Sequence, residues 1–354
     1  MLTYKYMKQR LLCGVIIVSL LVCSFCTACN TNKKLNKYTA TSFDYFDTAS
    51  IISGYATSQE EFDVIANEIL SQLAEYHKLY TIYHRFDGME NLCTINELVD
   101  GKHRTVKVDR KIVDMLKYAK EMYTLTNGKL NVAMGSVLSL WHSYRTIGRD
   151  DPSEAALPPM DKLREAAKHT DISNLIIDEE NLTVTITDPL MTLDVGAIAK
   201  GYATEQIALW LEKQNVNGFV LNIGGNVRTI GVKPNGEKWT VGVENSDGTD
   251  YLAYLNLSGE SVVTSGSYQR YYIVDGKKYH HIIHPTTLMP AQGYVSVSVI
   301  CKNSGLGDAL STALFCMPFE EGKAFVENMP DVEVLWVFED GKQFVSSGFN
   351  FYKK

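Results

Sequence analysis

The stretch TLDVGAIAKGYATE, residues 192–205, combines an acid, small residues and a lysine at the start of an expected helix. An apolar, strand-like segment ends at Asp194, and a helical pattern follows Lys200 and Gly201. The first turn of a helix has unpaired N–H groups and the positive end of the helix dipole, so small residues there let an anion approach the backbone. Lys200 adds a positive charge, and a carboxylate such as Asp194 binds a metal, a ribose hydroxyl or a ring N–H. The alternative is an ordinary capped helix whose small residues serve packing.

Around this stretch, helical and strand-like patterns do not alternate regularly, which predicts an α+β fold with mainly antiparallel sheets and flanking helices. Before it we expect a helix over 58–80, opened by a capping box of Ser58 and Glu61, and a second over 109–128. After it the chain is rich in strand-like segments, and the expected strands and hairpins lie within 218–231, 238–245, 251–258, 268–283, 294–303 and 332–348. A buried helix is expected over 308–317.

The composition is that of a folded globular protein. Of 354 residues, 45% are hydrophobic and 21% are charged, and the formal net charge is -7. No basic run occurs in the body of the chain. Because phosphate backbones are bound by clustered Lys and Arg, these features argue against a nucleic-acid partner.

The N-terminus has the pattern of an export signal. Basic residues within 5–10 precede the apolar segment LLCGVIIVSLLVCSF, 11–25, which is too short for a confident membrane-spanning helix. Small residues stand directly before Cys29, as in a bacterial lipoprotein signal whose cysteine becomes lipidated, although Cys26 replaces the usual Leu. An uncleaved anchor and an ordinary secretory signal are the alternatives.

These features divide the chain into three parts. Residues 1–29 are expected to be a lipoprotein signal peptide, 30–42 a polar tether, and 43–354 the functional domain, as one body or two lobes. The protein would then lie outside the cytoplasm, anchored to the cell membrane by the lipid on Cys29.

Paired glycines interrupt an apolar strand in LNIGGNVRTIG, 221–231. Gly224 and Gly225 allow a positive φ or a close backbone approach, so they indicate either a wall against a flat or phosphate-bearing ligand or a β-bulge. The spacing is not G-x-G-x-x-G and gives no support for a Rossmann site.

Three histidines fall within five positions of HHIIHPTTLMP, 280–290. If this segment is a strand, His280 and His284 share one face and His281 lies on the other. The spacing matches no strong zinc signature. A surface or packed histidine is one interpretation, and a general base or a ligand-contacting group is the other.

The segment DALSTALF, 308–315, places Asp308 and Thr312 one helical turn apart. A carboxylate and a hydroxyl on one helix face suit a hard cation such as Mg²⁺, whereas helix capping and packing are the alternative. No G-x-S-x-G, H-E-x-x-H or Walker A motif is present, which argues against those three enzyme classes.

Taken together and in order, these motifs resemble the FAD:protein FMN transferase family, also called ApbE-like. The resemblance covers nearly the whole mature chain. It rests on FDT at 46–48, YHRF with IN within 83–96, LNVAMGSVLSLW at 130–141, LDVGAIAKGYA at 193–203, LNIGGN at 221–226, SGSYQRY at 265–271, HIIHPTTLMP at 281–290 and DALSTALF at 308–315.

The resemblance implies an ApbE-like, T-fold-related architecture and a Mg²⁺-dependent reaction, with Mn²⁺ as a possible substitute. The enzyme would transfer the FMN part of FAD to a Thr or Ser hydroxyl of an exported or membrane flavoprotein, form a phosphoester and release AMP. The implied metal ligands are the backbone carbonyl of Ala197 and the side chains of Asp308 and Thr312. The implied FAD contacts are Phe46, Tyr83, Ala133, Met134, Gly135, Asp194, Lys200 and His281. His281 or a metal-linked carboxylate, Asp308, would remove the acceptor's proton.

The chain departs from the family pattern at several positions. His284 and Leu288 stand where the family has Asp and Gly, Leu130 and Asn131 replace a Phe-Asp pair, and Ser136 replaces Pro. Two other functions share the motifs. One is a Mg²⁺-dependent FAD pyrophosphatase that yields FMN and AMP, and the other is a non-catalytic flavin-binding lipoprotein.

Overall fold

The computed structural model describes residues 34–99, 101–103 and 105–351. Lys37–Lys354 make one compact unit. The predicted signal peptide, 1–29, and its lipidation site Cys29 lie outside the described residues. Within the part of the chain that is described, no helix has the length and apolar character needed to cross a membrane.

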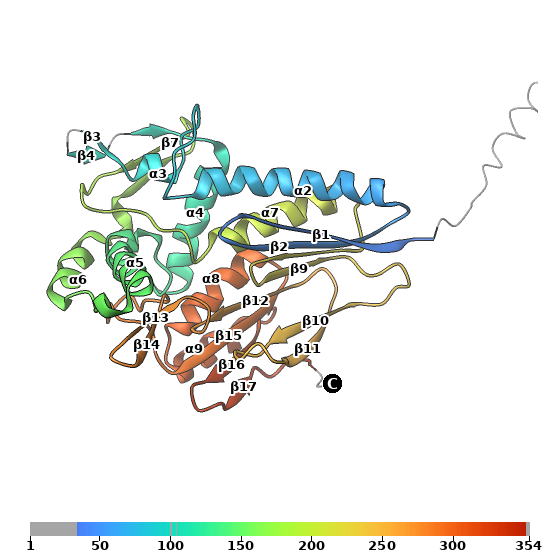
Figure 1. Cartoon of the computed structure of the whole chain (residues 1–354). Coiled ribbons are helices and arrows are strands. Elements are labelled where there is room, and N and C mark those ends of the chain that lie inside the picture. Colours follow the sequence, from blue (N-terminus) through green and yellow to red (C-terminus); the bar gives the residue numbers. More distant parts are fainter. Residues whose placement is uncertain (1–33, 100, 104, 352–354) are drawn as a thin grey trace, which may run out of the picture. The chain divides into compact units, whose positions relative to one another are not determined.

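An eight-stranded sheet forms the centre of the molecule (Figure 1). The strand order is β1-β2-β8-β9-β12-β15-β16-β17, and every pairing from β2 to β17 is antiparallel. The strands are β1 (Asn36–Tyr45), β2 (Thr48–Ala56), β8 (Phe219–Ile223), β9 (Asn226–Ile230), β12 (Ser261–Gly266), β15 (Tyr294–Cys301), β16 (Glu333–Phe338) and β17 (Gln343–Val345). With the helices below, this sheet confirms the predicted α+β class.

Strand β1 was not predicted from the sequence. Residues 36–42, which we expected to belong to the polar tether, form most of β1 beside β2. The polar side chains concealed the strand because β1 is an edge strand with much of one face exposed. Its other face has apolar support, since the ring of Tyr38 lies 5.7 Å from that of Phe62.

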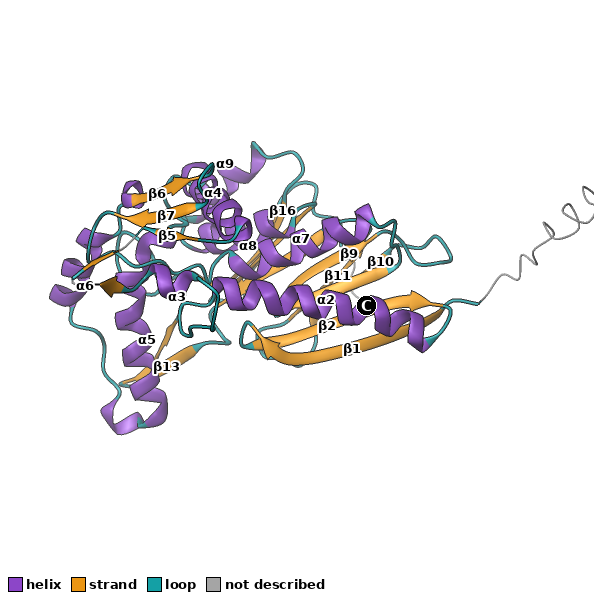
Figure 2. Ribbon diagram, turned by 90° about the horizontal axis from the view of Figure 1, so that it is seen from above, coloured by secondary structure: helices purple, strands orange, loops and turns teal. Residues whose placement is uncertain are grey.

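Three helices lie over one face of the central sheet, as Figure 2 shows from above. They are α2 (Gln59–Tyr80), α7 (Ala199–Lys213) and α8 (Ser304–Phe315). On the opposite face packs the hairpin of β10 (Trp239–Glu244) and β11 (Tyr251–Leu257). Side chains alternate along each strand, so β15 gives Val299 to the helix-covered core and Ile300 to the core beneath the hairpin.

Most helix boundaries follow the caps expected from the sequence. The Ser58 side chain accepts from the Glu61 N–H at the start of α2, and the Glu61 carboxylate accepts from the Thr57 N–H. Asp109 caps α4 (Arg110–Leu125) in the same way. Helix α8 starts at Ser304 with Asn303 as its cap, so Asp308 lies inside the helix and has no capping role there.

Most of the remaining elements gather beside the central sheet, around a three-stranded sheet and the hairpin of β13 and β14 (Figures 1 and 2). Helix α9 (Phe319–Glu327) instead packs against β16 and β17, since the Phe319 ring lies 5.6 Å from that of Trp336 and 4.8 Å from that of Phe344. The other helices are α3 (Leu92–Ile95), α5 (Gly135–Asp150), α6 (Met160–Ala166) and α9 (Phe319–Glu327), with 3₁₀ turns η1 (Val132–Met134), η2 (Pro152–Glu154), η3 (Ala167–His169) and η4 (Ile172–Asn174). The other strands are β3 (Leu98–Val99), β4 (Lys102–His103), β5 (Val106–Lys107), β6 (Leu175–Asp178), β7 (Thr183–Ile186), β13 (Tyr271–Val274) and β14 (Lys277–His280).

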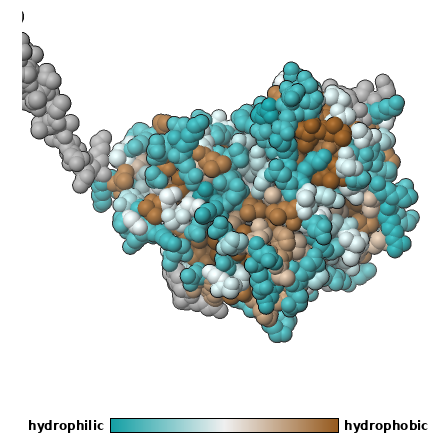
Figure 3. Space-filling view, turned by 180° about the vertical axis from the view of Figure 1, so that it is seen from behind, coloured by the Kyte–Doolittle hydropathy of each residue, from teal (hydrophilic) through white to brown (hydrophobic). Residues whose placement is uncertain are grey.

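The surface is mixed in character. Figure 3 shows hydrophobic residues in several patches between hydrophilic ones on the face opposite to Figure 1. The most exposed large apolar side chains of the described residues are Phe43 in β1 and Val64 in α2, at 75% and 71%. Exposed single apolar side chains are normal for a folded domain and carry no functional inference.

Candidate active site

A cavity of about 460 Å³ brings together most of the residues singled out from the sequence. Its wall includes Phe46, Tyr83, Met134, Asp194, Ala197, Lys200, His281, Asp308 and Thr312. These residues come from segments far apart in the chain. Lys200 lies in α7, and Asp308 and Thr312 lie in α8, so both helices border the cavity. Such a volume suits a small-molecule ligand.

Ala133 and Gly135 do not line the cavity but support it from behind. The Gly135 N–H donates to the Thr192 carbonyl at 3.0 Å, and the Asp194 N–H donates to the Val132 carbonyl at 2.8 Å. A Cβ atom on Gly135 would lie 2.5 Å from the Thr192 carbonyl oxygen. The 3₁₀ turn η1 and the first residue of α5 therefore hold the segment that ends in Asp194, and glycine permits the close approach.

Asp308 is a buried carboxylate at the contact between α7 and α8. Its side chain is 4% exposed, and Oδ2 accepts from the Gly201 N–H at 2.8 Å. Burial raises the pKa of Asp308 above its ordinary value, while Lys200 and hydrogen bonds from Gly201 and Asn226 act in the opposite direction. A buried carboxylate is retained at such a cost where it is paired or holds a metal.

The atoms around Asp308 fit a hard cation. Thr312 lines the cavity one turn further along α8, and its Oγ1 lies 3.2 Å from the Ser265 Oγ. The Asn226 Oδ1 is buried without a hydrogen-bond partner. Among the described residues, no cluster of three or more His, Cys, Asp or Glu side chains is placed to hold a metal. A site here would therefore combine one carboxylate with neutral oxygens, which is compatible with Mg²⁺ or Mn²⁺.

The cavity is also lined by positive charges. Lys200, Lys129, Arg145 and Arg270 lie in its wall, together with the acids Asp47, Asp194 and Asp308. Burial and the neighbouring Arg270 lower the pKa of Arg145. Because like charges are held near one another in a partly dry site, the arrangement favours an anionic ligand.

Of these four cationic residues, only Lys200 has a role assigned from the sequence. Lys129 and Arg145 belong to none of the motifs that carry a predicted role, and Arg270 lies within the segment SGSYQRY at 265–271. Arg145, His142 and Leu138 all line the cavity from α5. Their spacing of four and three residues puts them on one helix face, and polar residues on such a face were the available signal.

His281 lies in the cavity with one ring nitrogen unsatisfied. Strand β14 ends at His280, so the strand expected within 268–283 stops just before His281. The His281 Nδ1 is buried and has no hydrogen-bond partner. Burial, followed by the charges of Arg270, His280, Arg145 and Lys200, lowers the pKa of His281 to about 3. The imidazole is therefore neutral near pH 7 and is able to accept a hydrogen bond or a proton.

Tyr83, His142 and Asp194 form a polar chain along one wall. The Tyr83 hydroxyl lies 3.2 Å from the His142 Nδ1, and the His142 Nε2 lies 3.9 Å from the Asp194 Oδ2. The other Asp194 oxygen accepts from the Gly196 N–H at 2.9 Å. Burial lowers the pKa of His142, although Asp194 opposes this shift. These contacts hold the Asp194 carboxylate in place, while the Tyr83 side chain remains 58% exposed.

Phe46 reaches the cavity from the tip of the β1–β2 hairpin. Phe46 and Asp47 both have a positive φ, 55° and 52°, which side chains seldom adopt. The Phe46 N–H donates to the His77 Nδ1 at 3.1 Å, and the two rings make an edge-to-face contact at 5.5 Å. Arg270 donates to the Asp47 carbonyl at 3.4 Å. These contacts hold the strained turn against the cavity.

The paired glycines form a turn between β8 and β9, so the β-bulge alternative does not apply. Gly224 and Gly225 have φ values of 57° and 88°, the conformation of a two-residue hairpin turn. A Cβ on Gly224 would lie 2.5 Å from the Thr48 Oγ1. Gly224 also lines the cavity, so this turn contributes backbone to the wall.

His284 and Leu288, two of the positions where the sequence departs from the expected motif, lie outside the cavity wall. The His284 Nδ1 accepts from the Thr286 N–H at 3.0 Å, a bond that an Asp side chain is also able to accept. Leu288 has a φ of 62°, where glycine is favoured. Its side chain is buried, and its carbonyl accepts from the Trp141 Nε1 at 2.9 Å. His284 and Leu288 therefore hold the loop at 284–288 in place, His284 through its bond to Thr286 and Leu288 through its bond to Trp141.

Comparison with known proteins gives consistent matches. The model of the ApbE family matches residues 46–336. A protein of Klebsiella pneumoniae (strain 342) named FAD:protein FMN transferase is 31% identical over 288 residues, which cover 80% of this chain and 85% of the relative. A protein of the same name from Treponema pallidum (strain Nichols) is 34% identical over 259 residues, covering 69% and 70%.

Solved structures show the same arrangement. The crystal structure of the ApbE protein from Thermotoga maritima has a TM-score of 0.76 at 30% identity, covering 88% of this chain and 97% of its own. The flavin transferase ApbE from Vibrio cholerae has a TM-score of 0.73 at 25% identity, covering 89% and 99%.

Proposed function

The chain belongs to the ApbE family, and on this basis we propose that it transfers FMN from FAD to a target protein. The observation that carries the proposal is the cavity of about 460 Å³, in which the segment after Asp194, the α8 pair Asp308 and Thr312, and several cationic side chains face one space. A nucleotide with a diphosphate is an anion of a size that such a cavity accommodates in part.

In the proposed reaction, a Thr or Ser hydroxyl of the acceptor attacks the phosphorus on the FMN side of FAD. The new phosphoester bond forms as the bond to the AMP phosphate breaks, and AMP leaves with the charge. Lys200, Arg145 and Arg270 are positioned to bind and orient the diphosphate by charge. The ring of Phe46 and the hydroxyl of Tyr83 are available to the flavin nucleotide.

A divalent cation belongs to this proposal because the residues present fit it. Asp308, Thr312 and the backbone carbonyl of Ala197 would hold Mg²⁺, or Mn²⁺ in its place. When bound, the cation supplies positive charge that neutralises the diphosphate and the departing phosphate. Asp308 needs to be ionised for this role, and the hydrogen bonds from Gly201 and Asn226 favour that form.

We retain His281 as the candidate base for the acceptor hydroxyl. Its imidazole is neutral and its Nδ1 is free of protein partners. A pKa of about 3 makes it a weak base in the free enzyme, but an anionic diphosphate beside it would raise that pKa toward the working range. If His281→Ala keeps full turnover, His281 has no part in proton removal.

The pyrophosphatase alternative uses the same cavity, with water in place of the hydroxyl. Product analysis separates the two reactions. We expect AMP release from FAD to require the acceptor protein, with little free FMN formed. AMP and free FMN released in equal amounts without any acceptor would establish the hydrolase instead, and FAD bound without turnover would establish a binding protein.

We also propose that the protein is a lipoprotein outside the cytoplasm, anchored through Cys29, where it meets an exported or membrane flavoprotein. The support is the N-terminal sequence pattern alone. In cells, Cys29→Ala should abolish labelling by a radioactive fatty acid. Unchanged labelling of that variant would contradict the assignment.

A further inference from the structure

The two helices that carry the site are joined by reciprocal hydrogen bonds. The Gly201 N–H at the start of α7 donates to the Asp308 Oδ2 of α8 at 2.8 Å. In return, the Ser304 N–H at the start of α8 donates to the Glu205 Oε2 of α7 at 2.7 Å. In each helix the two residues are four positions apart and share one face. Each helix therefore supplies a carboxylate that satisfies a free N–H at the other's N-terminus.

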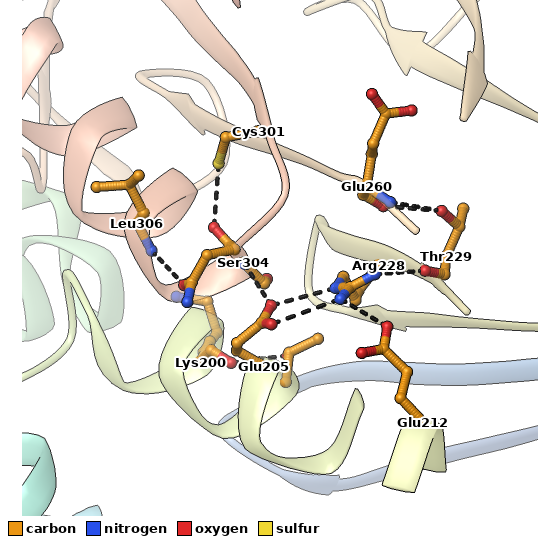
Figure 4. Close-up of polar contacts among 11 residues, drawn as sticks. Lys200, Glu205, Glu212, Arg228, Thr229, Glu260, Cys301, Ser304 and Leu306 are labelled. Carbon is orange, nitrogen blue, oxygen red and sulfur yellow. Dashed lines mark hydrogen bonds and ion pairs between the residues drawn. The ribbon is translucent and has the colours of Figure 1, made fainter. Parts of the chain in front are cut away.

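Arg228 of β9 holds the Glu205 carboxylate in place, as Figure 4 shows. Its Nε and Nη2 donate to the two Glu205 oxygens at 3.2 and 3.5 Å. Its other contacts are with the Thr229 carbonyl and with Glu212, which lies about two turns beyond Glu205 in α7. Arg228 and Glu205 are 3% and 4% exposed, so this is a buried ion pair.

The same strand reaches both carboxylates. Asn226 and Arg228 are two positions apart in β9 and lie on one face of the strand. Asn226 hydrogen-bonds Asp308, and Arg228 binds Glu205. Strand β9 is thus connected to the two helices at two places, through Asn226 to Asp308 and through Arg228 to Glu205. Of these two contacts, only the one at Asp308 borders the large cavity.

Glu205 itself does not line that cavity. It borders a separate, smaller one of about 260 Å³. Any influence of Glu205 on the reaction must therefore act through another residue. Stability alone does not explain a buried ion pair, because a well-packed apolar pair of similar volume is often as stable or more so.

We propose that Glu205 is a positioning residue that sets the place of Asp308, with Arg228 as its counter-charge. By fixing the start of α8 against α7, Glu205 would determine how tightly the site binds a divalent cation. This inference rests on the assignment of Asp308 as a metal ligand in the proposed function.

The test measures Mn²⁺ binding to the full-length chain in detergent. The electron paramagnetic resonance signal of free Mn²⁺ reports how much remains unbound, and the melting temperature of each protein is measured in parallel. Glu205→Gln keeps the size of the side chain and removes its charge. We expect it to weaken Mn²⁺ binding by at least about tenfold, the usual scale for residues behind a metal ligand. Glu212→Gln is the matched control, since Glu212 pairs with the same Arg228 but is 39% exposed and, within the described residues, has no hydrogen bond to α8. It should bind Mn²⁺ within about twofold of the unmodified chain.

A double variant, Glu205→Met with Arg228→Met, separates positioning from folding. Removing both buried charges should restore the melting temperature toward that of the unmodified chain, but the Ser304 N–H stays without its carboxylate. We expect Mn²⁺ binding to remain at least about tenfold weaker. Recovery of Mn²⁺ affinity together with the melting temperature would overturn the proposal, as would unchanged affinity in Glu205→Gln. The metal assignment fails if the unmodified chain binds no Mn²⁺, or if the Asp308→Asn variant binds Mn²⁺ as tightly as the unmodified chain. This inference then fails with it.

Discussion

At the scale of single residues, the site is built from groups in unfavourable states. Asp308 is a buried carboxylate with a raised pKa, and His281 is a buried imidazole with a pKa of about 3. Phe46 and Asp47, which both line the cavity, have a backbone conformation that favours glycine. Such features persist where the surrounding structure holds them, and they are frequent at functional sites.

Asp308→Asn should separate activity from stability. Asparagine keeps the shape of the side chain but removes the charge that a cation requires. A loss of several kcal/mol of charge stabilisation corresponds to a fall in turnover of about a hundredfold to a thousandfold. Because burial raises the pKa of Asp308 in the folded state, its ionised form is disfavoured there, and the variant should be at least as stable near pH 7. Turnover and urea unfolding measure the two effects, and full turnover of a folded variant would remove Asp308 from the metal site.

His281 should make stability fall in acid. Its folded pKa of about 3 lies below the ordinary value of 6.5, so the unfolded chain takes up a proton between these values and the folded chain does not. The stability present above pH 6.5 is therefore lost as the pH falls toward 3, by up to roughly 1.4 kcal/mol per pH unit. Urea unfolding at about pH 7 and about pH 4.5 should show a smaller loss for His281→Gln than for the unmodified chain. Equal losses in the two proteins would mean that His281 is not buried as a neutral ring.

At the scale of elements, the site depends on how closely α7 and α8 approach each other. Gly201 lies at their contact, and a Cβ there would be 2.4 Å from both the Asp308 Cβ and the Ser304 carbonyl oxygen. The N–H of the same residue binds Asp308. A glycine in a helix costs stability relative to alanine, so its presence is explained by this contact and not by helix formation.

Gly201→Ala should push the two helices apart. We expect a loss of about 1–3 kcal/mol in the free energy of unfolding, as for other overpacked contacts, and a loss of activity because Asp308 moves. Gly322→Ala in α9 is the matched control, since its nearest neighbour to a new Cβ lies at 3.3 Å and belongs to the flexible Leu314 side chain. That variant should be neutral or gain up to about 1 kcal/mol. Equal effects of the two substitutions on stability and turnover would show that the α7–α8 contact is not special.

At the scale of the whole molecule, local sequence patterns predicted much of the fold and of the candidate site. They did not predict the features that depend on contacts between distant segments. The α+β class, the caps of α2 and α4, and the position of Asp308 and Thr312 one turn apart in a helix follow from patterns within single segments. The sequence did not show that Phe46 is held by His77, or that the carbonyl of Leu288 binds Trp141, because these partners lie 31 and 147 positions apart. Arg145 was overlooked for the same reason, since only the fold brings α5 to the cavity.

The measurement that tests the central claim most directly is the mass of an acceptor flavoprotein domain after incubation with the full-length chain, FAD and Mg²⁺. The account predicts that the acceptor gains the mass of one FMN joined as a phosphoester. The gain should disappear with EDTA, with Asp308→Asn, and when the acceptor threonine is replaced by alanine. An unchanged acceptor mass, with AMP and free FMN accumulating in solution, would contradict FMN transfer and identify the chain as an FAD hydrolase.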